Sequence, residues 1–232
     1  MAVVDRSIYD LTVRSKDGSG GRTFTEQARR AQLVGCAIEL IAEVGYGLAS
    51  LSKIAERAGV AKSVVLYHFA GKEELLHTLV METFLASVPY LVPSVRAQES
   101  ARGKLLAYIR ANGRFIDENR TAALAMYEMY IGYRSPEGKR LDQVMVESVA
   151  ANPPQGDLAE LDPAGIFELG QRTGEFRAFP VHTMVMALRQ AIDGAVMFLV
   201  RDKEFDVIGY CEELVTIFDT ATKVTATKEG EP

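Results

Sequence analysis

Hydrophobic residues recur at intervals of three and four along most of the chain, the spacing that places them on one face of a helix. The first such stretch follows Thr23, which stands three residues before Glu26 as in a capping box, where each side chain bonds a backbone N–H near the other. Its apolar stripe comprises Leu33, Ala37, Leu40, Ile41 and Val44. Gly45 and Gly47 are expected to end this helix.

The next stretch, residues 51–69, has the pattern of two short helices joined by a turn. Ser50 can cap the first helix through its hydroxyl, and Gly59 can adopt the left-handed conformation that ends it. In the second helix Val65 and Phe69 lie on one face. The other face carries Ser63, Val64, Tyr67 and His68. This helix-turn-helix pattern presents a short polar and aromatic helix that can meet DNA base edges and phosphates.

Three regions are expected along the chain. Residues 1–21 end in KDGSGG and lack helical spacing, so they are predicted to form a flexible arm, which could reach a DNA minor groove or stay a solvated tail. Residues 22–71 form a three-helix domain, and residues 72–232 a larger helical bundle. The pattern in the bundle predicts helices at 72–91, 98–118, 120–133, 138–150, 157–174, 180–202 and 206–225, with breaks at VPSV and NPPQG. No stretch alternates as a strand would, so the predicted fold class is all-α.

The helix-turn-helix residues, IAERAGVAKSVVLYHFAGKEELL, resemble those of the tetracycline-repressor (TetR) family of bacterial transcriptional regulators. The resemblance is specific over about residues 25–80, where the AGV turn, the YHF sequence and the KEEL sequence occur together. Two positions depart from the family pattern. Ala61 stands where a capping serine or threonine is usual, and Leu66 stands where an aromatic residue is common.

The resemblance implies that Tyr67 and Lys72 touch DNA phosphates, where a phenol and an ammonium near a helix N-terminus form an anion site. Lys62 and Ser63 could reach base edges, and Val64 could contact a thymine methyl. His68 could donate to a phosphate or pack beside Phe69. Ser50 and Ser52 could cap the supporting helix or bond a phosphate. Further cations near this face are Arg22, Arg29, Arg30 and Lys53.

The last two long helices have apolar residues around most of their circumference, which requires burial on several sides. In the TetR family such helices pair with their symmetry mates as a four-helix interface, whereas an intrachain core is the alternative reading. The candidates for a homodimer interface are Leu188, Ala191, Ala195, Cys211, Leu214 and Phe218. A symmetric dimer would also supply two recognition helices for a palindromic operator.

The stretch Leu124–Arg134 is rich in Met and Tyr, side chains that suit irregular apolar ligand cavities but equally suit an ordinary core. The candidates for binding a small-molecule effector are Tyr108, Arg114, Phe115, Met126, Tyr127, Tyr130, Met184 and Phe198.

Composition and charge narrow the function classes. The net charge of −5 resides outside residues 1–80, which carry ten Lys or Arg against nine Asp or Glu. Cys36 and Cys211 lie in apolar helical patterns without metal spacing, and they read as buried thiols. We expect no catalytic set, metal site or cofactor. No window was expected to approach a membrane span, and the N-terminus lacks a signal-peptide pattern, so a cytoplasmic location is expected.

Together these features predict a ligand-responsive DNA-binding transcriptional regulator. The family resemblance implies a repressor that binds a palindromic operator as a homodimer and is released by a small apolar or amphipathic effector. Two alternatives stay open: a helical small-molecule-binding protein that does not read DNA, and an α-helical enzyme.

Overall fold

The computed structural model describes residues 23–224, and the predicted arm at 1–21 lies outside them, as does Arg22. The described chain is helical, and the predicted all-α fold is confirmed. Its elements are α1 (Phe24–Val44), the 3-10 helix η2 (Tyr46–Leu48), α2 (Leu51–Arg57), α3 (Lys62–His68), α4 (Lys72–Arg96), α5 (Ala101–Glu118), α6 (Arg120–Gly132), α7 (Leu141–Ala151), the 3-10 helix η3 (Gly156–Leu161), α8 (Ala164–Thr173), α9 (Val181–Arg201) and α10 (Val207–Thr222).

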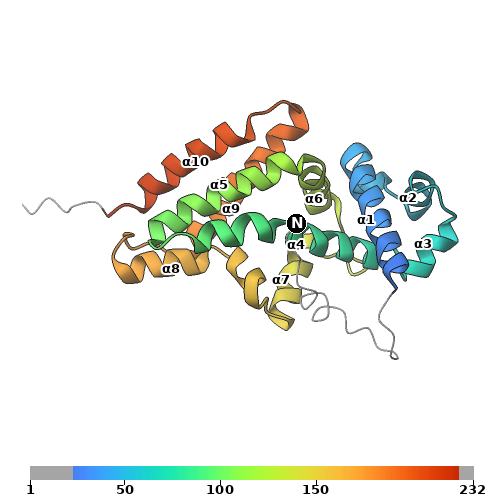
Figure 1. The fold of residues 1–232 in the computed structure, drawn as a ribbon, viewed down its shortest axis with the longest axis horizontal. Coiled ribbons are helices and arrows are strands. Elements are labelled where there is room, and N and C mark those ends of the chain that lie inside the picture. The colour runs from blue at the N-terminus through green and yellow to red at the C-terminus, as the bar shows by residue number, and fades with distance from the viewer. Residues whose placement is uncertain (1–22, 225–232) are drawn as a thin grey trace, which may run out of the picture.

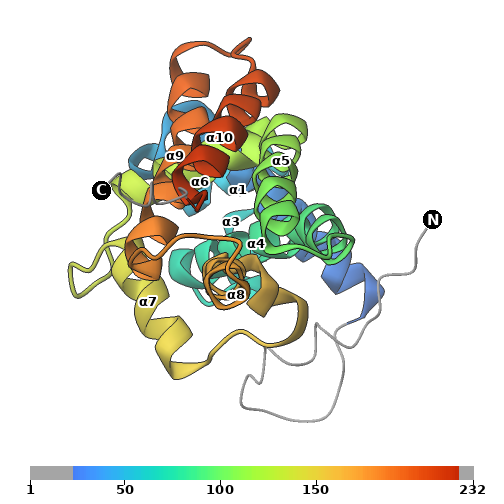
Figure 2. The ribbon, with the colours of Figure 1, turned by 90° about the vertical axis from the view of Figure 1, so that its left-hand side faces the viewer.

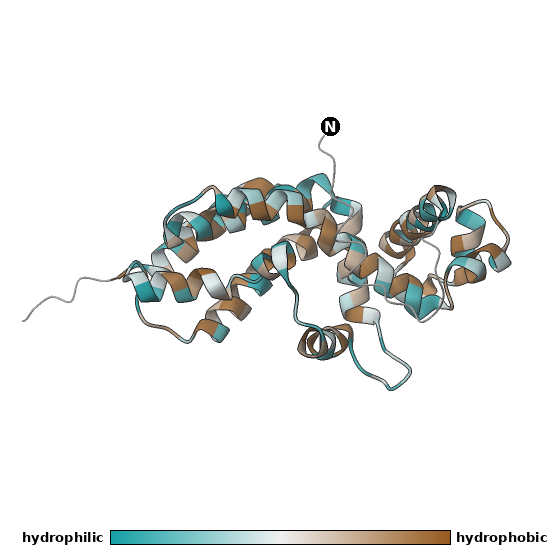
Figure 3. Cartoon of the chain, turned by 60° about the horizontal axis from the view of Figure 1, so that its bottom comes forward, coloured by the Kyte–Doolittle hydropathy of each residue, from teal (hydrophilic) through white to brown (hydrophobic). Residues whose placement is uncertain are grey.

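The molecule is elongated, with α1, α2 and α3 gathered at one end and α4 leading from them into the larger bundle (Figure 1). Viewed along the long axis, α10 and α7 lie on opposite sides of the bundle (Figure 2). Most helices carry hydrophobic residues on one side and hydrophilic residues on the other (Figure 3), as the spacing along the sequence predicts.

The local signals at the first helices form as predicted. The Thr23 hydroxyl accepts from the backbone N–H of Glu26, and the Glu26 carboxylate accepts from the backbone N–H of Thr23, which completes the capping box. Gly45 follows the last residue of α1 with φ of 79°, and Gly59 has φ of 66° in the turn between α2 and α3. Both glycines therefore occupy the left-handed region, where a side chain would be strained.

Two hydrophobic clusters hold the fold, and they do not divide at residue 72. The first cluster packs α1, α2, α3 and the first half of α4, and it also contains Ala125, Met129 and Tyr133 from the region of α6, with Leu141 from α7. The second cluster joins the end of α4 with α5, α8, α9 and α10. The residues after α4 therefore do not form a separate core, because α6 and α7 pack together with the helix-turn-helix.

The predicted break at VPSV is wrong, since α4 continues through it to Arg96 with Pro89 and Pro93 inside the helix. Each proline removes one helical hydrogen bond, a loss that ordinarily kinks or ends a helix. Both prolines are exposed, so the carbonyls left without a partner can meet water. Leu91, Val92 and Val95 are buried on the opposite side. Their burial favours continuation of the helix.

Two helices, α4 and α9, are long and apolar enough to cross a membrane by length and composition, with mean hydropathies of 1.5 and 1.4. This corrects the expectation that no window approaches a span. One or two such helices are weak evidence for a membrane protein, because core helices pass the same test. In the helical window of α9 only 33% of residues are buried, which leaves an apolar face uncovered within one chain.

Candidate DNA-binding surface and effector domain

The recognition helix α3 turns its apolar side inward and its polar side outward. Val65 and Phe69 are buried against α1 and α2, whereas Lys62, Ser63 and Tyr67 are exposed, and Val64 is half-buried. Ala61 occupies the N-cap without a side-chain hydrogen bond, as its methyl group requires. The Ala61 side chain therefore caps none of the first backbone N–H groups of α3.

The supporting helix α2 begins at a conventional cap. The Ser50 hydroxyl accepts from the backbone N–H of Lys53 at 3.3 Å, so capping is one role of this serine. Ser52 is exposed in the first turn. At the other end, the Arg57 guanidinium pairs with the Glu43 and Glu39 carboxylates of α1, which fixes α2 against α1.

Tyr67 is exposed on the outer side of α3, with 74% of its surface accessible. Its hydroxyl lies 3.4 Å from a carboxylate oxygen of Glu26, and its ring meets the His68 ring edge-on at 5.0 Å. Hydrogen bonds from Thr23 hold the pKa of Glu26 below its usual value, so this carboxylate is charged at neutral pH. The Tyr67 hydroxyl therefore lies beside a charged carboxylate of α1.

Lys72 opens α4 and is half-buried. Its ammonium donates to the backbone carbonyl of Tyr46 at 3.2 Å and lies 4.2 Å from the centre of the Tyr46 ring. Burial lowers the pKa of Lys72, and the negative charge of Glu73 partly opposes this shift. The lysine thus stands at the helix N-terminus that the family resemblance predicts, with its position set by Tyr46.

Arg30, which the sequence predicts to be a cation near the DNA-facing side, is instead buried. It is only 9% exposed, and its guanidinium donates to the His68 carbonyl and pairs with Glu74 at 3.2 Å. The same group lies 4.0 Å from the centre of the Phe69 ring. The sequence could have predicted this burial, because Arg30 precedes the buried Leu33 and Val34 of α1 by three and four positions and so lies on the same face. Arg30 therefore joins α1, the end of α3 and the start of α4.

The eight predicted effector residues do not share one lining. Tyr108 is buried in the second cluster, where its hydroxyl donates to the Leu161 carbonyl at 3.0 Å. Phe115 is buried beside Tyr90, whose ring it meets edge-on with centres 5.4 Å apart. Tyr127 and Met184 pack at the edge of the same cluster, whereas Met126 packs against the first cluster. Tyr130 and Phe198 are partly exposed, and Phe198 stacks on Phe205 with ring centres 5.0 Å apart.

Arg114, the remaining effector candidate, lines an open groove of about 510 Å³ between α4, α5 and α10. Its guanidinium donates to the Ser94 hydroxyl at 2.8 Å. Arg110, one turn earlier, makes two hydrogen bonds to the Glu212 carboxylate across the groove. The pairing lowers the pKa of Glu212, so the two charges hold α5 to α10 at neutral pH.

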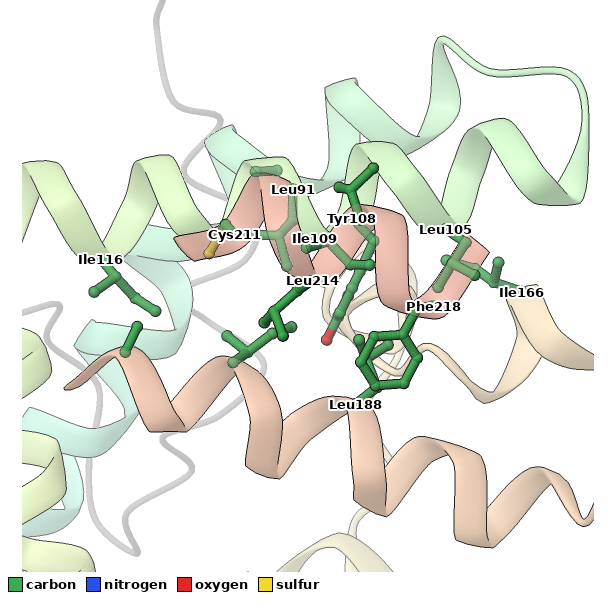
Figure 4. Packing of buried hydrophobic residues seen from close by; sticks show 14 of the residues in the cluster. Leu91, Leu105, Tyr108, Ile109, Ile116, Ile166, Leu188, Cys211, Leu214 and Phe218 are labelled. Atoms are coloured by element: carbon green, nitrogen blue, oxygen red, sulfur yellow. The ribbon is translucent and has the colours of Figure 1, made fainter. Parts of the chain in front are cut away.

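The predicted interface residues lie mainly inside the chain's own core. Leu188, Ala195, Cys211, Leu214 and Phe218 are at most 5% exposed, and Figure 4 shows Leu188, Leu214 and Phe218 pointing toward Tyr108 and Ile109 of α5. Ala191 is half-buried and packs at the edge of this cluster. The stripe was therefore assigned to the wrong partner, because α5 and α8 cover it.

A different apolar stripe on α9 and α10 is open. Met186, Met197, Phe198 and Val200 on α9 and Ile217 on α10 are between 45% and 55% exposed. Met186, Met197 and Val200 fall on one face of α9, together with Gln190 and Asp193. This face is hereafter called the open α9 face.

Residues 33–79 match the model of the family described as bacterial regulatory proteins, tetR family. The fatty acid metabolism regulator protein of Bacillus subtilis (strain 168) is 33% identical over 78 residues, which cover 34% of this chain and only 40% of that protein. The HTH-type transcriptional activator FasR of Mycolicibacterium smegmatis is 26% identical over 187 residues, covering 80% of this chain and 79% of FasR.

The fold is shared with solved structures. The transcriptional regulator FadR from Bacillus subtilis, in complex with stearoyl-CoA, has a TM-score of 0.68 at 23% identity and covers 82% of this chain and 98% of its own. At this identity the likeness concerns the fold alone. The family match instead falls within α1 to α4, on the stretch that holds the left-handed Gly59 and the outward face of α3. In sequence, this helix-turn-helix domain is similar to that of the tetR family of bacterial regulatory proteins.

Proposed function

We propose that the protein is a transcriptional regulator that binds operator DNA through α3 and the first turn of α4. The observation that carries the proposal is the outward polar face of α3, where Lys62, Ser63 and Tyr67 are exposed on one side of a helix whose other side is buried. Base edges would be read by the first turn of α3, and phosphates would be held by Tyr67 and Lys72. Few polar side chains reach bases, so DNA shape would contribute to discrimination.

We further propose a homodimer formed through the open α9 face. Exposed methionine and valine side chains at helical spacing are costly in water, and a second copy related by a two-fold axis would cover them. The two α3 helices would then meet successive major grooves about 34–36 Å apart on a palindromic site. Occupancy of that site would repress transcription.

The effector is proposed to be amphipathic, with a long-chain acyl-CoA as the first compound to test. The proposal is supported by the stearoyl-CoA bound to the Bacillus subtilis FadR and by the name of the fatty acid metabolism regulator. In this chain the helical bundle that would bind the effector contains α6, which shares a hydrophobic core with the helix-turn-helix domain. An effector that binds only one arrangement of α6 would shift the separation of the two α3 helices.

The test is selection of duplexes from a random-sequence pool by the full chain, followed by binding titrations with and without stearoyl-CoA. The proposal predicts enrichment of an inverted repeat and weaker DNA binding when the acyl-CoA is present. By linkage, the selected duplex must weaken acyl-CoA binding by the same factor. Failure to enrich any sequence would refute operator binding. Equal DNA affinity with and without the acyl-CoA would refute this effector.

A further inference from the structure

The end of α6 meets the start of α4 in a group of four residues, Tyr46, Lys72, Glu73 and Tyr133, here named the Lys72 cluster. The Tyr133 hydroxyl donates to a Glu73 carboxylate oxygen at 2.6 Å, and the Tyr133 ring meets the Tyr46 ring edge-on at 5.7 Å. Tyr46 in turn holds the Lys72 ammonium through its carbonyl and its ring. A residue of the effector domain is therefore two contacts away from the proposed phosphate-binding lysine.

The fit between α6 and Tyr46 is close. A Cβ atom added at Gly132, the last residue of α6, would lie 3.3 Å from Cβ of Tyr46 and 3.4 Å from Cδ1. Tyr133 itself is 6% exposed. A shift of α6 along or away from α4 must therefore move Tyr46 or break the Tyr133–Glu73 bond.

The charges explain why that bond matters for Lys72. Burial and the hydrogen bond to Glu73 both raise the pKa of Tyr133, so its hydroxyl keeps the proton that it donates. The bond holds one oxygen of Glu73, the residue directly after Lys72, toward α6. Without Tyr133 the carboxylate is free to turn toward the ammonium, and an ammonium paired with a carboxylate attracts a phosphate less strongly.

We propose that Tyr133 is a positioning residue for DNA binding: it holds one Glu73 oxygen toward α6 and so limits how far Glu73 neutralises Lys72. In this way the end of α6 sets the phosphate affinity of the helix-turn-helix domain. The inference rests on the proposed function, because it assumes that Lys72 contacts DNA. Under this proposal, the hydrogen bond from Tyr133 to Glu73 transmits a movement of α6 to the DNA contact at Lys72.

The test compares variants of the full chain on a 30-base-pair duplex of mixed sequence at low salt. Such a probe is sufficient because a phosphate contact acts on all sequences alike. Tyr133→Phe keeps the ring and removes the donor, and it is expected to weaken binding about threefold to tenfold, the range for loss of one hydrogen bond. In the Lys72→Ala background Tyr133→Phe should have no further effect. In the Glu73→Gln background, where no carboxylate can neutralise Lys72, its effect should fall below twofold.

Tyr90→Phe is the matched control, since it removes a hydroxyl that donates to Glu118 at 2.8 Å between α4 and α5, within the helical bundle. It should leave DNA binding unchanged. If Lys72→Ala weakens binding but Tyr133→Phe does not, the positioning role is refuted while the phosphate contact survives. If Lys72→Ala has no effect, the proposed phosphate contact itself fails. An equal loss from Tyr133→Phe in the wild-type and Glu73→Gln backgrounds would also refute the role assigned to Glu73.

Discussion

Replacement of Arg30 by alanine tests how α1, α3 and α4 are held together in the helix-turn-helix domain. The guanidinium is 9% exposed and bonds the His68 carbonyl, Glu74 and the Thr78 hydroxyl while it stacks on Phe69. Its removal leaves the carbonyl at the end of α3 without this donor and leaves Glu74 without its cation. It also removes the contact that joins three helices around Phe69.

The magnitude follows from these contacts. A hydrogen bond from a charged donor contributes about 1.5–3 kcal/mol. The Glu74 side chain is 40% exposed, so solvent screens the ion pair and limits its contribution to about 1 kcal/mol at most. The contact with the Phe69 ring adds roughly 0.5–1 kcal/mol. Arg30→Ala should therefore lower the free energy of unfolding by about 2–4 kcal/mol.

The assay is urea unfolding followed by circular dichroism, with wild type and variants at one protein concentration, because the stability of the proposed dimer would depend on it. Arg29→Ala is the matched control, since the neighbouring arginine bonds only the Gln32 side chain among the described residues. The control should stay within about 0.5 kcal/mol of wild type. A comparable result for Arg30→Ala would refute the assignment of Arg30 as a structural residue.

Three further results are expected. On the open α9 face, Met197→Glu should give a folded monomer by light scattering, and a Met197→Glu dimer of wild-type affinity would contradict the proposed interface. Leu214→Glu instead places a carboxylate in the core and should lower the free energy of unfolding by several kcal/mol. Burial raises the pKa of the Cys211 thiol to about 11. In the Cys36→Ser variant, where Cys211 is the remaining cysteine, Ellman's reagent at pH 8 should therefore react only after unfolding. A rapid reaction of the folded protein would show that the thiol is accessible. Gly132→Ala, which crowds Tyr46, should weaken DNA binding more than it lowers stability, and the reverse order would separate α6 from the DNA contact.

The sequence predicts those features of the fold that depend on neighbouring residues. The Thr23–Glu26 cap, the left-handed Gly59 and the inward face of α3 all follow from residues within a few positions of one another. The two prolines in α4 misled the prediction because long-range burial of Leu91 and Val95 outweighs a local loss of hydrogen bonds.

The features that the sequence could not supply depend on which helix packs where. Two apolar stripes run along α9, and spacing alone cannot say that α5 and α8 cover the stripe containing Leu188 while the stripe containing Met197 stays open. In the same way, the hydrophobic pattern of α6 does not show that Met129 and Tyr133 join the core of the helix-turn-helix domain. The Tyr133–Glu73 contact therefore required the structure.

The most direct test of the central claim, that α3 and the start of α4 form a DNA-binding surface, is the salt dependence of duplex binding. The slope of the logarithm of the binding constant against the logarithm of salt concentration should fall in magnitude by about one in Lys72→Ala, with binding weakened on all sequences alike. Lys104→Ala is the matched control, because Lys104 also donates to a backbone carbonyl at 3.2 Å but lies on α5 in the bundle. Its slope should equal that of wild type. Identical slopes for Lys72→Ala, Lys104→Ala and wild type would contradict the account.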